Sequence, residues 1–372
     1  MDPAEYKAIF QMNSEMRDYV QRMLKGHPGQ LDFLKAITDD WKVGGTQGVT
    51  YMWQDDPARS TTPVRTAMMV FQSKEGDCNE VSALVVAEAR EAGISAFLAY
   101  VTENEQGESI SHACAAVFVR GEVPEGLAYG KFETDAGFRA RTLATAGIEE
   151  SEGLHMVLID PVSLSKQMGN QHREVELLGD RQALSFHLSD KAGTISLLSP
   201  HIFSEVDGLL KGAVALNPDN YNAWVQRGDL YLRLADGKFT FSKDFTEEQK
   251  KPFYEHAISY YSTALGLEPR IASAYVGMGG AFEKLGDSNS AIDAYKRGAA
   301  AVPDSYAMHK ALGALYYRLG DRQKALEQYE TAANKLKAGG HLDTGVVKRI
   351  AEIRAEFRQP NIPGKNHTEK LA

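Results

Sequence analysis

The chain has 372 residues, of which 43% are hydrophobic and 24% are charged. This composition is typical of globular proteins and excludes a largely disordered, collagen-like or membrane-embedded chain. The 41 Lys and Arg residues against 50 Asp and Glu give a net charge of -9, and the sequence contains no long basic run. Nucleic-acid binding therefore lacks its usual electrostatic basis. Because a domain holds roughly 100–200 residues, the length predicts two domains, or one domain followed by repeats.

The two cysteines, Cys78 and Cys114, are too few for a disulfide framework and do not form the paired clusters of a structural zinc site. No run approaches the ~18 apolar residues of a membrane span, so we expect no integral membrane segment. The start MDPAEYKAIF lacks the basic and apolar regions of a signal peptide. We expect a cytoplasmic location for the chain as given, and a periplasmic or envelope-associated location if a leader has been removed.

Helical patterns alternate with Gly-rich stretches in the first part of the chain. They predict helices over residues 3–24, 30–39, 63–72 and 80–92. The last of these is opened by Gly76-Asp77-Cys78 and ends at Gly93. Three strand-like segments follow, FLAYV, ACAAVFV and MVLID. A mixed α and β domain is the structure that this order predicts.

Cys78 stands at a helix start, where the helix dipole favours a thiolate and the first amides are free to donate. His112 opens the second strand-like segment and Asp160 closes the third. A thiolate beside an imidazolium that a carboxylate orients is the arrangement used in cysteine acyl transfer. We therefore expect Cys78, His112 and Asp160 to converge within side-chain reach.

Three stretches carry a family resemblance: GDCNEVSALVVAEAREAGISAFLAYV, SHACAAVFVRG and LHMVLIDPV. They resemble the core of the transglutaminase-like superfamily over about residues 60–165. FQMNSEMRDYV and PVRTAMMVFQSKEGDC, with the repeats described below, resemble bacterial members fused to tetratricopeptide repeats, some of which are envelope lipoproteins. The resemblance implies a papain-like fold with Cys78 as nucleophile, His112 as general base and acid, and Asp160 as the orienting carboxylate. It requires no metal and no organic cofactor.

The sequence departs from the family pattern around His112. Ala113 and Cys114 follow it where members of the family have an aromatic residue, and Asp160 lies 48 residues further on. The extra length comes from an insertion near residues 121–153. Its composition, rich in Gly and charge, predicts a surface excursion, with a substrate-gating loop as the alternative.

Other roles for these residues stay open at this point. Cys78 has the alternative of a buried structural thiol, and His112 that of a core histidine. Asp160 precedes a proline, which is also common at turns. Cys114 shares a strand face with His112, as a metal ligand or redox partner would. His155 is an alternative base.

An oxyanion site needs two donors. The Cys78 backbone amide is expected to supply one of them. For the second donor, the candidates upstream are Gln47, Trp53 and Gln54.

A 34-residue period organises the C-terminal third. Small and aromatic residues recur in register at Tyr275, Gly279, Phe282, Gly286, Ala291 and Tyr295, and again at His309, Gly313, Tyr316, Gly320, Ala325 and Tyr329. These positions resemble those of tetratricopeptide repeats, in which small residues let paired helices approach and aromatics fill the gaps. We therefore expect the aromatic residues of the repeats, such as Trp224 and Tyr231, to be packing residues.

The period extends towards the N-terminus through an earlier repeat, which carries about 17 extra residues around 236–253. A half repeat precedes Asn217-Pro218, and residues 343–357 read as a terminal capping helix. The prediction is three full repeats with two caps. Stacked hairpins of this kind form a right-handed array, whose concave surface is expected to bind a protein or peptide.

The predicted architecture is an α+β papain-like transglutaminase-like domain followed by an all-α tetratricopeptide superhelix. Its parts are a helical segment over 1–60, the transglutaminase-like domain over 61–165, a linker over 166–200, the repeat array with its capping helix over 201–357, and a flexible tail over 358–372. The predicted function is that of a thiol enzyme that cleaves or transfers an amide through a Cys thioester. The amide is a peptide, isopeptide or glutamine-type substrate, and the repeats recruit a protein partner. The alternative is a catalytically inactive scaffold that binds peptides and acts as an adaptor.

Overall fold

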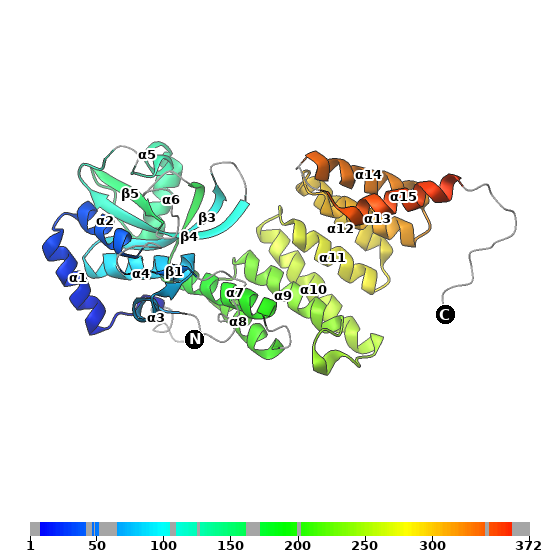
Figure 1. Ribbon diagram of the computed structural model, residues 1–372, viewed down its shortest axis with the longest axis horizontal. Coiled ribbons are helices and arrows are strands. Elements are labelled where there is room, and N and C mark those ends of the chain that lie inside the picture. Colours follow the sequence, from blue (N-terminus) through cyan, green and yellow to red (C-terminus); the bar gives the residue numbers. More distant parts are fainter. Residues whose placement is uncertain are drawn as a thin grey trace. The chain divides into compact units, whose positions relative to one another are not determined.

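The structure is a computed structural model. It describes residues 8–41, 47, 49–51, 65–104, 109–124, 127–160, 172–198, 202–338 and 342–358. Two compact units, residues 1–223 and 224–372, make up the chain. The first contains strands and helices, whereas the described part of the second is helical (Figure 1).

A four-stranded antiparallel sheet in the order β5-β4-β3-β6 forms the centre of the first unit (Figure 1). Its strands are β3 (Ser95–Asn104), β4 (Ser109–Arg120), β5 (Leu154–Ile159) and β6 (His172–Leu178). Two short strands, β1 (Thr50–Tyr51) and β2 (Glu75–Gly76), pair in parallel in a separate sheet. Alternate residues of a strand point to opposite faces, so each central strand serves two cores.

Helix α4 (Cys78–Glu91) packs against β3 and β4 and fills the first core. Asp77 caps it by accepting the Glu80 backbone N–H at 2.9 Å, while the Glu80 carboxylate accepts the Asp77 N–H. This capping box fixes the first turn of the helix. The helix ends before Gly93, whose φ of 75° favours glycine. Around α4 lie η1 (Ala8–Phe10), α1 (Ser14–Gly26), α2 (Gln30–Trp41) and α3 (Ala67–Ser73).

One acidic side chain is buried in the middle of α4. The carboxylate of Glu88 accepts two contacts from Trp41 Nε1, at 3.0 and 2.9 Å. Burial raises the pKa of Glu88 well above its ordinary value, although the Trp41 hydrogen bond and the Lys74 charge act in the opposite direction. Glu88 therefore favours its neutral form.

The stability of Glu88→Gln relative to wild type is expected to increase as the pH rises from 5 to 8. The folded pKa of Glu88 lies above its unfolded pKa, so the folded chain holds an extra proton and wild-type stability falls with rising pH. Gln has no proton to lose and keeps an acceptor for Trp41. The relative gain is measured by urea unfolding of both proteins at each pH. Glu91→Gln, at the partly exposed end of α4, is the control; an equal gain there would contradict the burial argument.

The opposite face of the sheet is covered by α5 (Gly130–Thr134) and α6 (Ala136–Ala146). Phe132, Phe138 and Leu143 form a second core with strand residues that include Cys114 and Phe118. The insertion predicted as a surface excursion or gating loop is therefore a packed layer. Its apolar side chains are spaced for helices, and this spacing outweighs its Gly-rich composition.

The segment predicted as a linker over 166–200 is structured where it is described. Residues 172–178 form β6, the edge strand beside β3, and α7 (Asp180–Leu198) follows directly. Helix α7 packs against α8 (Phe203–Leu216), where Ser185 Oγ donates to the Ala213 carbonyl at 2.7 Å. The predicted linker is thus wrong for residues 172–198, and α7 completes the helix pair that was expected to be a half repeat.

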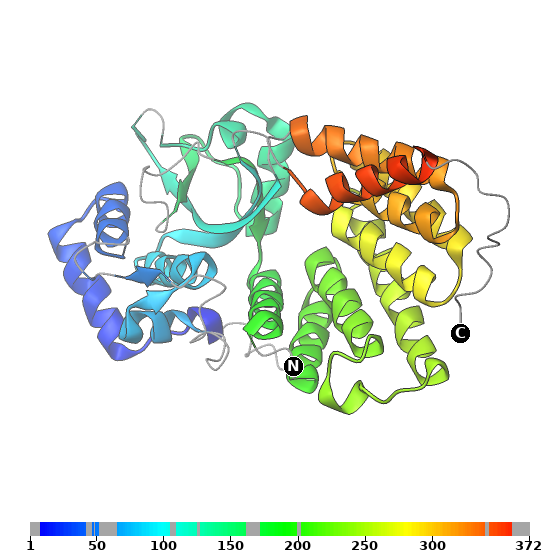
Figure 2. The same ribbon diagram turned by 45° about the vertical axis from the view of Figure 1, so that its right-hand side comes forward.

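The second unit is built from antiparallel helix hairpins, which Figure 2 shows side by side. Its helices are α9 (Tyr221–Ala235, whose first residues belong to the first unit), α10 (Glu247–Leu267), α11 (Ala272–Lys284), α12 (Ser288–Ala301), α13 (Ala307–Arg318), α14 (Arg322–Ala338) and α15 (Thr344–Arg358). The predicted hairpins and terminal helix are confirmed. The extra residues of the first hairpin form a short 3-10 helix, η3 (Thr240–Ser242), and the first turns of α10.

A glycine of the first helix faces a tyrosine of the second in each hairpin. A Cβ atom on Gly279 would lie 2.3 Å from the ring of Tyr295, and one on Gly313 would lie 3.0 Å from Tyr329. In the hairpin with the insertion, Gly228 faces Tyr261 in the same way, at 2.5 Å. The predicted role of small residues in close helix approach is therefore seen three times.

Candidate functional site

Cys78 is the first residue of α4, and its side chain lies at the junction of the helix with β4. It is 9% exposed. A ring nitrogen of His112 and the backbone N–H of Ala113 hydrogen-bond to its sulfur. The capping box of Asp77 and Glu80 sets the direction in which the helix begins, and hence where the sulfur lies.

His112 and Asp160 are brought together by the pairing of β4 with β5. The last residue of β5, Ile159, lies opposite Ala115, which is three positions after His112 on β4, so the residue that follows Ile159 lies near His112. His112 Nε2 is 2.8 Å from Asp160 Oδ2, with the two side chains 21% and 7% exposed. The structure therefore places all three predicted side chains in one cluster, with His112 between the sulfur and the carboxylate.

The charge state of this cluster differs from that expected for a cysteine at a helix start. Burial alone would lower the pKa of His112, but the Asp160 hydrogen bond and the contacts with Cys78 raise it to about 10. For Cys78, burial raises the pKa of the thiol and the Asp77 charge adds to this effect, whereas His112 and Ala113 act against it. The Asp160 carboxylate thus favours the protonated imidazole, whereas burial makes the thiol hold its proton more tightly than the helix dipole alone predicts.

Asp160→Asn is expected to slow alkylation of Cys78 at pH 7.5 about tenfold or more, which corresponds to a rise of one unit or more in the pKa of the thiol. Without the carboxylate the imidazolium is less favoured, so the thiolate loses its positive neighbour. The measurement is the iodoacetamide rate at Cys78 followed by peptide mass mapping between pH 6 and 10. Glu133→Gln removes a carboxylate 3.2 Å from His155 and serves as the control. Equal rates in wild type and Asp160→Asn would contradict the coupling.

Cys114 was an alternative metal ligand or redox partner, and His155 an alternative base; neither is one of the three side chains that meet at Cys78. Cys114 is fully buried in the second core, where burial first, and then the Asp160 and Cys78 charges, raise the pKa of its thiol well above the ordinary value. His155 lies opposite Val119, seven positions along β4 from His112, or about 23 Å. It is therefore too far away to act as the base. Among the described residues, no group of three or more His, Cys, Asp or Glu side chains is arranged to hold a metal ion.

The predicted oxyanion donors are only partly within the described residues. The backbone N–H of Gln47 donates to the Asp40 carbonyl at 3.0 Å. Trp53 and Gln54 lie outside the described residues. Sequence reasoning missed the Ala113 N–H as a partner of the sulfur, because backbone donors leave no mark in the residue pattern.

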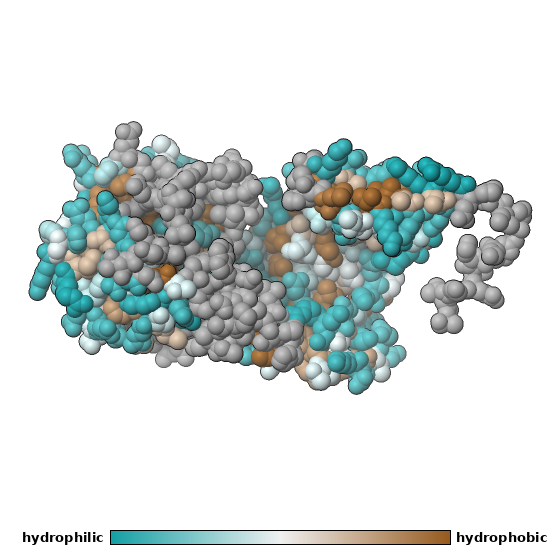
Figure 3. All heavy atoms as spheres, in the orientation of Figure 1, coloured by the Kyte–Doolittle hydropathy of each residue, from teal (hydrophilic) through white to brown (hydrophobic). Residues whose placement is uncertain are grey.

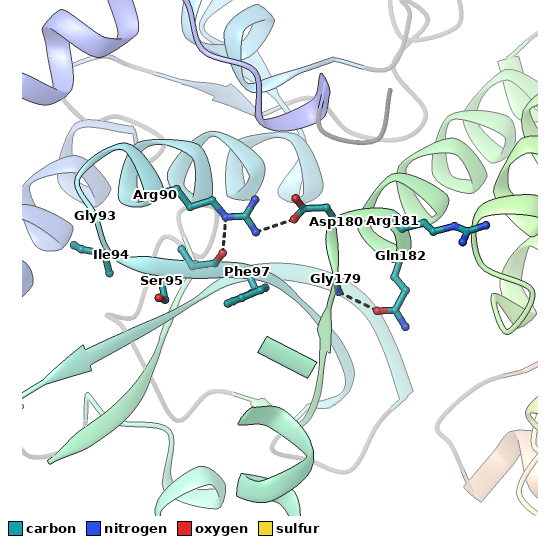
Figure 4. Close-up of a pocket in the computed structure, with 10 residues that line it drawn as sticks. Arg90, Gly93, Ile94, Ser95, Phe97, Gly179, Asp180, Arg181 and Gln182 are labelled. Atoms are coloured by element: carbon teal, nitrogen blue, oxygen red, sulfur yellow. Dashed lines mark hydrogen bonds and ion pairs between the residues drawn. The ribbon is translucent and has the colours of Figure 1, made fainter. Parts of the chain in front are cut away.

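A surface pocket of about 830 Å³ lies at the other end of α4 (Figure 4). There Arg90 Nη2 is 2.8 Å from Asp180 Oδ1, and Arg90 Nε donates to the Ala96 carbonyl at 2.7 Å. Arg90 is twelve residues from Cys78 on the same helix, or about 18 Å. This pocket therefore does not contain the cluster of Cys78, His112 and Asp160.

Comparison with known proteins identifies one domain. Residues 17–128 match the model of the family described as the transglutaminase-like superfamily. This range contains Cys78 and His112 and ends before Asp160. No curated protein matches the chain. None of the helices in the described ranges has the length and apolar character needed to cross a membrane.

Similar solved structures align with the chain at low identity. One is the tetratricopeptide protein TTC0263 of Thermus thermophilus, with 23% identity over 46% of this chain and 81% of that chain, and a TM-score of 0.39. Another is PilF of Pseudomonas aeruginosa, with 13% identity over 48% and 72%, and a TM-score of 0.38. A third is MamA of Desulfovibrio magneticus, with 16% identity over 41% and 76%, and a TM-score of 0.33.

Proposed function

Because residues 17–128 match the model of the transglutaminase-like superfamily, we propose that the protein is a thiol enzyme that cleaves or transfers an amide. Cys78 is the nucleophile, His112 the acid and base, and Asp160 the carboxylate that orients the ring. The observation that carries this proposal is the position of His112, which hydrogen-bonds to the sulfur and lies 2.8 Å from Asp160. Nucleophilic acyl transfer by cysteine needs this order of groups.

The charges of the cluster suggest the order of proton transfers. Loss of one proton from the Cys78–His112 pair leaves a thiolate beside an imidazolium that Asp160 stabilises. The sulfur attacks the amide carbon, and His112 gives its proton to the leaving amine as the C–N bond breaks. Water or an amine then attacks the thioester and returns a proton to His112. In this proposal the Cys78 backbone amide, at the helix start, stabilises the oxyanion, with Gln47, Trp53 and Gln54 as candidates for a second donor.

The test is to trap the thioester. The full chain is incubated with glutamine-containing peptides and hydroxylamine, which converts a thioester into a hydroxamate and frees the thiol. We expect hydroxamate formation with wild type and acylated Cys78 in peptide maps when hydroxylamine is omitted. Hydroxamate formation that persists in His112→Ala at the wild-type rate would contradict the proposed role of the cluster.

One observation favours the second candidate function, a peptide-binding scaffold without catalysis. Cys78 is 9% exposed, and burial raises the pKa of its thiol, so little thiolate is present at neutral pH. A scaffold would bind the same peptides without releasing ammonia or forming hydroxamate. Isothermal titration with those peptides therefore separates the two functions.

For the helical unit we propose the recruitment of a protein partner through the first helices of its hairpins. Stacked hairpins present a continuous surface that a single pair lacks. Figure 3 shows hydrophobic residues at the mostly hydrophilic surface of this unit. Leu319, which follows directly after the first helix α13, is 51% exposed. Lys284 and Lys310 lie on first helices, α11 and α13, whereas Lys324 and Lys335 lie on the second helix α14. Cross-linking to captured partners should occur through the first pair; cross-links only through the second pair would contradict recruitment by this surface.

A further inference from the structure

The residue after His112 is held at both ends of its backbone by side chains of α4. The Ala113 N–H donates to the Cys78 sulfur, and the Ala113 carbonyl accepts the Ser82 hydroxyl at 3.3 Å. Cys78 and Ser82 are one turn apart on the helix, so they lie on the same face. Two successive turns of α4 thus contact one residue of β4.

The strand register explains why the backbone of Ala113 is available for these contacts. The pairing of β4 with β5 begins at Ala115 and Ile159 and does not extend to Ala113. In an antiparallel strand, the N–H and C=O of one residue point to the same side, and this side alternates from one residue to the next. Ala113 has both groups on the side where β5 would pair, and β5 does not reach it. Buried backbone groups need a partner, and the two side chains of α4 provide one for each. Ser82 is itself fully buried, so its hydroxyl also depends on this contact.

We propose that Ser82 is a positioning residue for the nucleophile. By holding the Ala113 carbonyl, it keeps the Ala113 N–H directed at the sulfur and fixes the strand beside His112. The sulfur then has two donors when it is negatively charged. This inference rests on the proposed role of Cys78, but its test uses the titration of the thiol and not turnover.

The consequence of losing the hydroxyl is specific to the sulfur. Without Ser82 Oγ, the Ala113 carbonyl loses its partner on α4, so its backbone, although still paired with Tyr100 of β3, is held towards α4 by its N–H alone. The thiolate then loses a hydrogen bond that favours it, so the thiol should titrate at higher pH. A purely structural role for Ser82 would lower stability without moving this titration.

The experiment measures iodoacetamide alkylation of Cys78 between pH 6 and 10 by peptide mapping, in the full chain and in Ser82→Ala. We expect the midpoint of the variant to rise by about half a unit or more, with a rate at pH 7.5 that is about three- to tenfold lower. Ser185→Ala is the matched control, because Ser185 is also fully buried and its hydroxyl also donates to an alanine carbonyl, that of Ala213. It should lower the melting temperature without moving the midpoint.

The outcomes separate this inference from the proposed function. An unchanged midpoint in Ser82→Ala overturns the positioning role, even if the melting temperature falls. A midpoint that also shifts in Ser185→Ala overturns it as well, because the effect would then come from general loosening of the unit. If wild type forms no hydroxamate but Ser82→Ala still shifts the midpoint, the proposed function fails and the positioning role stands.

Discussion

Cys78→Ala is expected to abolish hydroxamate formation and amide hydrolysis, with a loss on the order of 10⁴-fold or more, the scale seen when a member of a catalytic triad is removed. The sulfur forms the covalent bond of the proposed reaction, so no neighbouring side chain can replace it. The melting temperature should change little, because Cys78 stands at a helix start and alanine is a good helix former. Activity is measured as hydroxamate, and stability by differential scanning calorimetry.

Leu84→Ala on the same helix provides the opposite result. Leu84 is fully buried in the core between α4 and the sheet, so its truncation leaves a cavity and should cost roughly 2–5 kcal/mol. The fraction that stays folded should retain alkylation of Cys78. Full turnover in Cys78→Ala would end the assignment of the nucleophile, and a stability loss as large as that of Leu84→Ala would show that the thiol is structural.

The parts of the fold that sequence reasoning predicted depend on local patterns. The helix at Cys78 was recognised because its opening, Gly76-Asp77-Cys78, and its end at Gly93 lie within a few turns of one another. The hairpins were recognised because Gly279 and Tyr295, like Gly313 and Tyr329, recur with one period. In both cases the residues that make the contact are also the residues that form the pattern.

The parts that were missed depend on contacts between distant segments. Strand β6 pairs with β3, whose residues precede it by about 70 positions, and no feature of HREVELL alone identifies that partner. The pKa of Cys78 also depends on contacts between distant segments. The helix start is local and favours the thiolate, whereas burial by the sheet is not local and has the larger effect. Sequence therefore identified the nucleophile candidate but not its resting charge.

Gly279→Ala is expected to destabilise the helical unit by about 1–3 kcal/mol, as overpacking in a tight core does. A Cβ atom there would lie 2.3 Å from the Tyr295 ring, which is itself buried and whose hydroxyl donates to Glu283 Oε1 at 2.6 Å. The ring has no free direction in which to move, so the two helices must separate. The measurement is urea unfolding followed by far-UV circular dichroism.

Gly280→Ala is the matched control, because it makes the same chemical change one residue further along α11. No atom lies within 4 Å of a Cβ at this position, so the expected result is a small gain of about 0.5–1 kcal/mol from better helix propensity. The sign of the effect should therefore reverse between adjacent glycines. Combining Gly279→Ala with Tyr295→Leu should recover part of the loss, since the shorter side chain vacates the space that the Cβ needs. Equal effects at the two glycines would mean that backbone entropy, and not the contact with Tyr295, determines the result, and the packing argument for the repeats would then fail.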